Sequence, residues 1–442
     1  MSTELTVRVV QDPSRGFTTL PDEVTQSPDL IVSLDVLAGD RIRARMHGPA
    51  VASLFGTEHR ADLTARPADV RAAAMRLCRL WKDVFVGFRS PEHDSRPPSP
   101  DHPEYPFATL VDLRSQPPRA LLEVLDELAL AGQQLLFATL LGGTDPQVEV
   151  FRKHLAGTLS AREGCRVRFD SELYIPWPMV CLRPEDLPQF AAAGGPAAVY
   201  QRFLGHRHQI EQTGGSYPWL GSRRQAPDVP TVSLNHDEQV DVQGRTRAAD
   251  VAALLARDTH FVQRSRRSEL RLALADHTLC EHLMYFWCHG HFMPNGAHPP
   301  ALALRLTDGV PIDADTVREC RHNAGTDHPF QPFVMINACH AGVPAEGCDP
   351  AFFGGALIRA GARGVLAPQV EMPQIFAAEY ALEFLTRYLA GRHTAGEAAH
   401  SAARYFADEL HNPLGFAYAL HCGMDARLER AAQPAEAHGP IT

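Results

Sequence analysis

Two apolar runs in the last third of the chain each lead into a residue suited to acid–base or nucleophilic chemistry. Leu283–Cys288 is followed by His289 and Gly290, and Phe333–Ile336 continues through Asn337 and Ala338 to Cys339. A cysteine thiol has a pKa of about 8.5 and needs a base to become a nucleophile at neutral pH. A histidine within hydrogen-bond reach accepts that proton. The two residues, 50 positions apart, therefore predict a His/Cys dyad of the kind that cysteine peptidases use.

The surrounding elements indicate how the two residues meet. From about residue 120, strand-like runs alternate with helical patterns, as in the strands expected at 231–234 and 260–263 and the helices expected at 246–256 and 265–275. Such alternation predicts an α/β fold with a mostly parallel sheet flanked by helices. Functional loops gather beyond the carboxyl ends of such strands, so neighbouring strands that end in His289 and Cys339 would present them side by side. The backbone N–H groups of Gly290 and Cys339 would then form an oxyanion hole.

The chain is predicted to contain two parts. Alternating apolar and polar residues at 4–10 and 30–36 indicate half-buried strands of a smaller β-rich module, which we assign to residues 1–106. This module ends in a stretch with six prolines between Ser90 and Pro106, which cannot continue a helix or an inner strand. Residues 107–430 are expected to form the α/β domain, and 431–442 a flexible tail.

Composition excludes several classes of protein. An apolar content of 45% with 21% charged residues is typical of a globular chain. The net charge of −10 argues against nucleic-acid binding, which needs a basic face. Residues 1–14 lack the apolar core of a signal peptide, and no run approaches the ~18 apolar residues of a membrane span. We therefore expect a cytoplasmic protein with no membrane association, and the nine scattered cysteines are typical of reduced thiols.

Zinc binding is the main alternative for the region around the two runs. The chain has 22 histidines, and several lie with cysteines between residues 280 and 340. A structural zinc site usually supplies closely paired ligands such as C-x₂₋₄-C with H-x₃₋₅-H, and these residues have no such pairing. We therefore predict no metal and no cofactor. Stoichiometric zinc in the purified protein would contradict the peptidase interpretation.

Longer segments resemble the CHAT family of caspase-like peptidases, which is related to metacaspases, caspases and separase. The segments that carry the resemblance are Tyr285–Gly290, Leu304–Gly309 and Met335–Gly342, with further matches at Ile175–Trp177, Ala360–Val365 and Pro413–Phe416. The resemblance covers roughly residues 120–425. It implies a caspase-haemoglobinase fold with His289 as general base and Cys339 as nucleophile. It also implies an endopeptidase with a protein or peptide substrate, acting in bacterial defence or cell death and held inactive until a small-molecule or protein activator signals.

Four further residues are candidates for the substrate-binding cleft. Metacaspases often place an acidic residue two positions before the nucleophile, where it helps to select basic side chains; here that position is Asn337, so this preference is not carried over. His291 competes with His289 for the role of base, and we favour His289 because the glycine follows it directly. His291 and His340 are then expected to line the pocket. Asp308 is a candidate pocket acid, although aspartate more often caps a helix or closes a turn.

A caspase-fold sensor or scaffold that binds without cutting is the alternative function. The N-terminal module would then dock a partner protein. Arg207, Arg223 and Arg224 would bind an anionic signal such as a nucleotide, although a solvated surface loop is the commoner role for such a group. The presence of both dyad residues favours the peptidase over this alternative.

Overall fold

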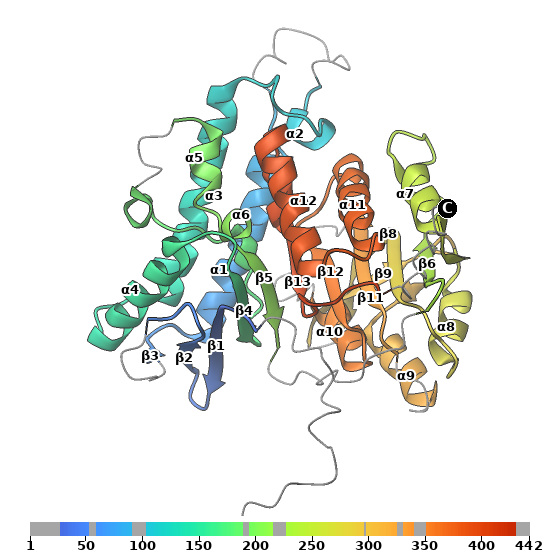
Figure 1. Ribbon diagram of the computed structural model, residues 1–442, viewed down its shortest axis with the longest axis horizontal. Coiled ribbons are helices and arrows are strands. Elements are labelled where there is room, and N and C mark those ends of the chain that lie inside the picture. Colours follow the sequence, from blue (N-terminus) through green and yellow to red (C-terminus); the bar gives the residue numbers. More distant parts are fainter. Residues whose placement is uncertain are drawn as a thin grey trace, which may run out of the picture.

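The computed structural model describes residues 27–52, 59–90, 103–188, 194–214, 227–295, 298–324, 330–339 and 351–429. Its centre is a sheet of thirteen strands with helices packed against it (Figure 1). Among the described residues, seven of the twelve strand pairings are parallel and five are antiparallel. The predicted fold class, α/β with a mostly parallel sheet flanked by helices, is therefore confirmed.

The strands and helices are distributed along the whole described chain. The strands are β1 (Leu30–Leu37), β2 (Arg41–His47), β3 (His59–Leu63), β4 (Arg166–Ser171), β5 (Gln209–Thr213), β6 (Thr231–His236), β7 (His260–Arg264), β8 (Leu283–Asn295), β9 (His298–Arg305), β10 (Pro311–Ile312), β11 (Phe333–Cys339), β12 (Gly364–Pro368) and β13 (Tyr418–His421). The α-helices are α1 (Pro67–Leu80), α2 (Pro106–Thr109), α3 (Pro118–Gln134), α4 (Pro146–Ala161), α5 (Pro196–Tyr200), α6 (Leu204–Arg207), α7 (Ala248–Ala256), α8 (Arg267–Ala275), α9 (Ala314–Ala324), α10 (Ala351–Arg359), α11 (Gln374–Leu389) and α12 (Ala395–Leu410).

Strand β8 lies at a fork in the sheet. The strand order is β10-β9-β8-β11-β12-β13-β5-β4-β1-β2-β3, and β6 also pairs with β8 and with β7. One edge of β8 pairs with β11. The opposite edge pairs first with β6, as far as Trp287, and then with β9 from His289 onward. His289 therefore lies where β8 changes its neighbour from β6 to β9.

This fork corrects one expectation from the sequence. The apolar run was expected to end its strand at His289, but β8 continues to Asn295. The continuation is possible because β9 folds back antiparallel and supplies backbone partners where β6 no longer does. What ends at His289 is the pairing with β11. Backbone pairing of this kind does not require an apolar run, so hydrophobicity alone placed the end of the strand too early.

Side chains of β8 and β11 are buried on both faces of the sheet, as expected for inner parallel strands. Tyr285 and Trp287 belong to the large core that α7, α11 and α12 cover, whereas Met284 and Phe286 belong to a second core under α8, α9 and α10. Residues of one strand that point to the same face are two positions apart. His289 therefore lies on the same face as Tyr285 and Trp287.

The first described strands join the same sheet as the rest of the chain. β1 pairs in parallel with β4, and β2 and β3 extend the sheet beyond it. The strand expected at 30–36 corresponds to β1, while the one expected at 4–10 and the tail at 431–442 lie outside the described residues. The domain boundary at residue 106 stays a prediction. The pairing of β1 with β4 means that such a module would extend the central sheet.

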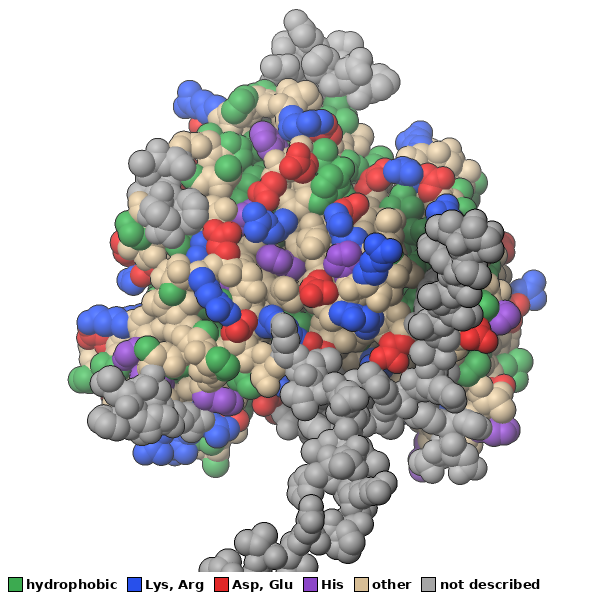
Figure 2. Space-filling model, viewed as in Figure 1, with side chains coloured by type: hydrophobic (Ala, Val, Ile, Leu, Met, Phe, Trp, Pro, Cys, Tyr) green, Lys and Arg blue, Asp and Glu red, His purple; other side chains and the backbone are tan. Residues whose placement is uncertain are grey.

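Charges of both signs are mixed on the surface. Figure 2 shows Lys and Arg side chains interspersed with Asp and Glu over one face of the molecule. On α12, for example, Arg404 lies within ion-pair distance of both Asp408 and Glu163. Such exposed pairs contribute little to stability, about 0–1 kcal/mol each.

No helix in the described part of the chain is both long and apolar enough to cross a membrane.

Candidate active site

The register of β8 and β11 brings the two predicted dyad residues together. The strands run parallel from Phe333 opposite Leu283 to Cys339 opposite His289. Neighbouring strands lie about 4.8 Å apart, so the backbones at these two positions are adjacent. The His289 side chain is 33% exposed, which leaves its ring accessible to a substrate. The side chain of Cys339 lies outside the described part of the structure, so its bond with His289 stays a prediction.

An acidic residue that the sequence interpretation missed lies beside His289. Asp237 follows β6 directly, and its backbone N–H donates to the carbonyl of Trp287 at 2.9 Å. Its Oδ2 lies 3.8 Å from His289 Nε2, and its side chain is only 8% exposed. Its Oδ1 accepts the backbone N–H of Gln239 at 2.9 Å. The turn after β6 thus holds a carboxylate next to the imidazole ring.

Gly290 is packed closely on both sides. A Cβ at this position would lie 3.1 Å from Ala338 Cβ and 3.3 Å from Leu302 Cδ1, which is tighter than most real contacts. A larger residue would therefore push against β11 one position before Cys339. The glycine expected to serve in an oxyanion hole also has a packing reason to be glycine.

Asn337 is closed off from the surface of the site. Its side chain is 1% exposed, and its Oδ1 accepts the Tyr418 hydroxyl at 2.7 Å. Its Nδ2 donates to the Ala377 carbonyl at 2.9 Å and to Tyr285 Oη at 3.2 Å. The sequence interpretation placed Asn337 in the substrate-binding cleft. In the described residues its amide ties β11 to β8, α11 and β13, and a contact of Asn337 with substrate stays a prediction.

Replacement of Asn337 by alanine is expected to destabilise the fold. The change would leave the Ala377 carbonyl and the Tyr418 hydroxyl buried with no amide partner, and each such loss typically costs about 1–3 kcal/mol. We expect the free energy of unfolding, measured in urea, to fall by about 3 kcal/mol. Asn323→Ala, at an exposed position of α9, should change it by less than about 0.5 kcal/mol. Equal effects of the two changes would contradict this role.

The other three candidates for the substrate-binding cleft are His291, Asp308 and His340. His291 Nε2 lies 2.7 Å from Arg305 Nη2, and burial together with that guanidinium lowers the pKa of His291. It therefore accepts a hydrogen bond as a neutral ring, and it lies beyond the point where β11 ends. Asp308 is exposed after β9, where it accepts the backbone N–H groups of Arg267 and Val310; this is the capping role. His340 lies outside the described residues.

Neither of the alternative binding sites gains support. No group of three or more His, Cys, Asp or Glu residues in the described ranges is placed to hold a metal ion. Arg207, expected in a loop that binds an anionic signal, is instead a buried residue of α6 that donates to the carbonyls of Leu159 and Ser160. Arg223 and Arg224 fall in a range that the structure does not describe.

Comparisons with known proteins agree with the resemblance noted in the sequence. A family model described as the CHAT domain matches residues 191–417. A probable protease of Vitiosangium sp. (strain GDMCC 1.1324) is 29% identical over 206 residues, which cover 40% of this chain and 26% of that protein. This chain thus spans about a quarter of the length of that curated relative.

Two crystal structures of the Saccharomyces cerevisiae separase–securin complex are also similar to the structure of this chain. Their TM-scores are 0.42 and 0.45, with sequence identities of 11% and 9%. Each match covers 89% of this chain and 30% of the separase chain.

Proposed function

Because this chain belongs to the CHAT domain family, we propose that it is a caspase-like cysteine endopeptidase. The observation that carries the proposal is the register of β8 and β11, which sets Cys339 directly opposite His289. Family membership and the relative described as a probable protease support the same activity. They also support a caspase-haemoglobinase fold.

In the proposed mechanism, His289 takes the proton of the Cys339 thiol, and the thiolate attacks the carbonyl carbon of the scissile peptide bond. The backbone N–H groups of Gly290 and Cys339 would bind the oxyanion that forms. His289 then donates its proton to the leaving amine, and water releases the acyl group from the sulfur. Asp237 would hold the imidazole in position and stabilise its protonated form during the first step.

The substrate of the enzyme and the regulation of its activity are part of the same proposal. We propose a specific protein substrate, an activator that is a small molecule or a protein, and a cytoplasmic role in bacterial defence or cell death. These points rest on family membership and on the curated relative, of which this chain covers only a quarter.

Alkylation by iodoacetamide tests the dyad without knowledge of the substrate. A thiolate reacts and a thiol does not, so we expect Cys339 to label at least tenfold faster than Cys280 at pH 6.5. Cys280 is an exposed thiol on the same chain and serves as the internal reference. Cys181 should stay unlabelled, because it is fully buried and burial raises its pKa.

The control for this experiment is His289→Ala, in which the advantage of Cys339 over Cys280 should disappear. If Cys339 labels no faster than Cys280 in the unaltered protein, the dyad is not formed. A caspase fold that binds without cutting would then be the better interpretation.

A further inference from the structure

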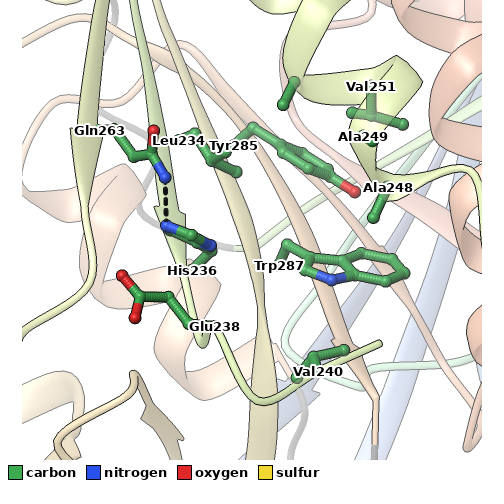
Figure 3. A pocket seen from close by; sticks show the side chains of 11 residues that line it. Leu234, His236, Glu238, Val240, Ala248, Ala249, Val251, Gln263, Tyr285 and Trp287 are labelled. Atoms are coloured by element: carbon green, nitrogen blue, oxygen red, sulfur yellow. Dashed lines mark hydrogen bonds between the residues drawn. The ribbon is translucent and has the colours of Figure 1, made fainter. Parts of the chain in front are cut away.

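A cavity of about 270 Å³ is lined in part by Trp287, two residues before the proposed catalytic histidine (Figure 3). Its walls come from β6 and the segment that follows it, from α7, from Gln263 of β7, and from Tyr285 and Trp287 of β8. Trp287 and His289 lie on the same face of β8, two positions apart, which is about 6.6 Å along the strand. The cavity therefore lies on the same face of the sheet as His289.

The wall of the cavity is mainly apolar. Its lining includes Leu234 of β6, Val240, the α7 residues Ala248, Val251 and Ala252, and the ring of Trp287. Figure 3 shows Ala248 and Val251 on the helix side, near the Trp287 ring. A cavity of this size is smaller than the roughly 300–1,000 Å³ that drug-sized ligands occupy. It fits one side chain of a larger molecule better than a whole cofactor.

The polar groups that line the cavity determine which charged side chains could bind in it. His236 Nε2 is hydrogen-bonded to Gln263 Nε2 at 2.6 Å, so each of these nitrogens already has a partner within the protein (Figure 3). Burial lowers the pKa of His236, which keeps its ring neutral at physiological pH. Glu238 is exposed and adds a negative charge to the lining. An acidic side chain would therefore meet repulsion and find no cation among these residues.

Trp287 adds an unused hydrogen-bond donor to the wall. Its side chain is buried, and Nε1 has no hydrogen-bond partner within the described structure. An indole nitrogen can only donate, and a buried donor without an acceptor is unfavourable by about 1–3 kcal/mol. A small shift of the ring on binding would let Nε1 donate to a peptide carbonyl, which is the acceptor that an extended substrate offers at every residue.

We propose that this cavity is a specificity pocket that takes an uncharged apolar side chain of the substrate, from a residue within about three positions of the bond that is cut. This inference rests on the proposed peptidase function. The reach follows from geometry, because an extended peptide spans about 3.3–3.6 Å per residue and the pocket begins about 6.6 Å from His289 along β8. Trp287 and Ala252 determine the depth of the pocket, and Glu238 excludes acidic residues.

Cleavage of a mixture of capped octapeptides, randomised at each position, tests the pocket. The unaltered protein should prefer Leu, Met or Val over Asp or Glu by at least tenfold at one position near the cut. Ala252→Phe, which fills the cavity, should lower kcat/KM for those peptides about tenfold and favour Ala or Gly there instead. Ala253→Phe is the matched control, because Ala253 is exposed on the same helix and does not line the cavity.

Two results would overturn the pocket. One is an identical cleavage profile for Ala252→Phe and the unaltered protein. The other is a preference for Lys or Arg that Glu238→Gln abolishes, which would mean that the cavity selects basic side chains.

A binding measurement separates failure of the pocket from failure of the peptidase. Fluorescent peptides with Leu or Asp at the selected position are titrated by anisotropy against Cys339→Ala, which cannot cut. If the unaltered protein does not cut, cleavage selects no position, and Leu and Asp are then compared at each of the eight positions. Tighter binding of a Leu peptide that Ala252→Phe abolishes supports the pocket even if Cys339 proves unreactive. Equal binding of Leu and Asp peptides at every position contradicts the pocket, whatever the activity.

Discussion

Replacement of Cys339 by alanine is expected to abolish peptide cleavage, with a loss of at least about a thousandfold. The thiolate forms the bond to the substrate, and alanine has no atom that can replace it. Residual cleavage would come only from binding and from the oxyanion hole, which in other hydrolases account for a minor share of the rate enhancement. Cleavage of the peptide mixture, followed by mass spectrometry, provides the measurement.

Two controls make this result specific. Thermal unfolding of Cys339→Ala should match that of the unaltered protein within a few degrees, because alanine fits wherever cysteine does in a strand. Cys280→Ala removes an exposed thiol outside the site and should leave cleavage unchanged. Cleavage that survives in Cys339→Ala would reject this residue as the nucleophile.

The adjacency of the backbones at His289 and Cys339 could be predicted because it depends on local patterns. Each residue follows an apolar run long enough to form an inner strand, and a connection that contains a helix, here α9, is typical of parallel neighbours. Parallel neighbours place their carboxyl ends together, so two reactive residues at such ends become adjacent. The observed register, with Cys339 opposite His289, agrees with that expectation.

The position of Asp237 beside His289 could be predicted only in part. β6 is also an inner strand of the sheet, and it is followed by a polar segment that begins at Asp237. The apolar residues of β6 indicate the strand, and Asp237 follows its last residue. What the sequence does not indicate is that β6 is a direct neighbour of β8, because strand order depends on tertiary packing.

The role of Asn337 could not be read from local sequence at all. Its hydrogen-bond partners Ala377 and Tyr418 lie 40 and 81 residues further along the chain. Nothing near Asn337 distinguishes an amide that faces a substrate from one that is buried beneath the site. Burial of a polar group with complete partners is a property of the assembled core.

Replacement of Asp237 by asparagine is expected to lower kcat about 10- to 100-fold with little change in KM. At 3.8 Å and an effective dielectric of 20, a carboxylate stabilises a neighbouring imidazolium by about 4 kcal/mol, and the partial exposure of His289 reduces this to about 1–3 kcal/mol. Asparagine keeps the shape and the turn contact with Gln239 but carries no charge. The effect should therefore fall on the step in which His289 becomes protonated.

Iodoacetamide labelling distinguishes this electrostatic role from a structural one. If Asp237 stabilises the protonated His289, it also favours the thiolate of Cys339, so Asp237→Asn should slow the labelling of Cys339 in proportion to kcat. Asp250→Asn removes an exposed carboxylate on α7 and should change neither rate. A variant that unfolds at a lower temperature yet labels Cys339 at the original rate would show that Asp237 only holds the turn after β6. Parallel loss of labelling and kcat, with KM and unfolding temperature preserved, would establish Asp237 as the residue that positions the base.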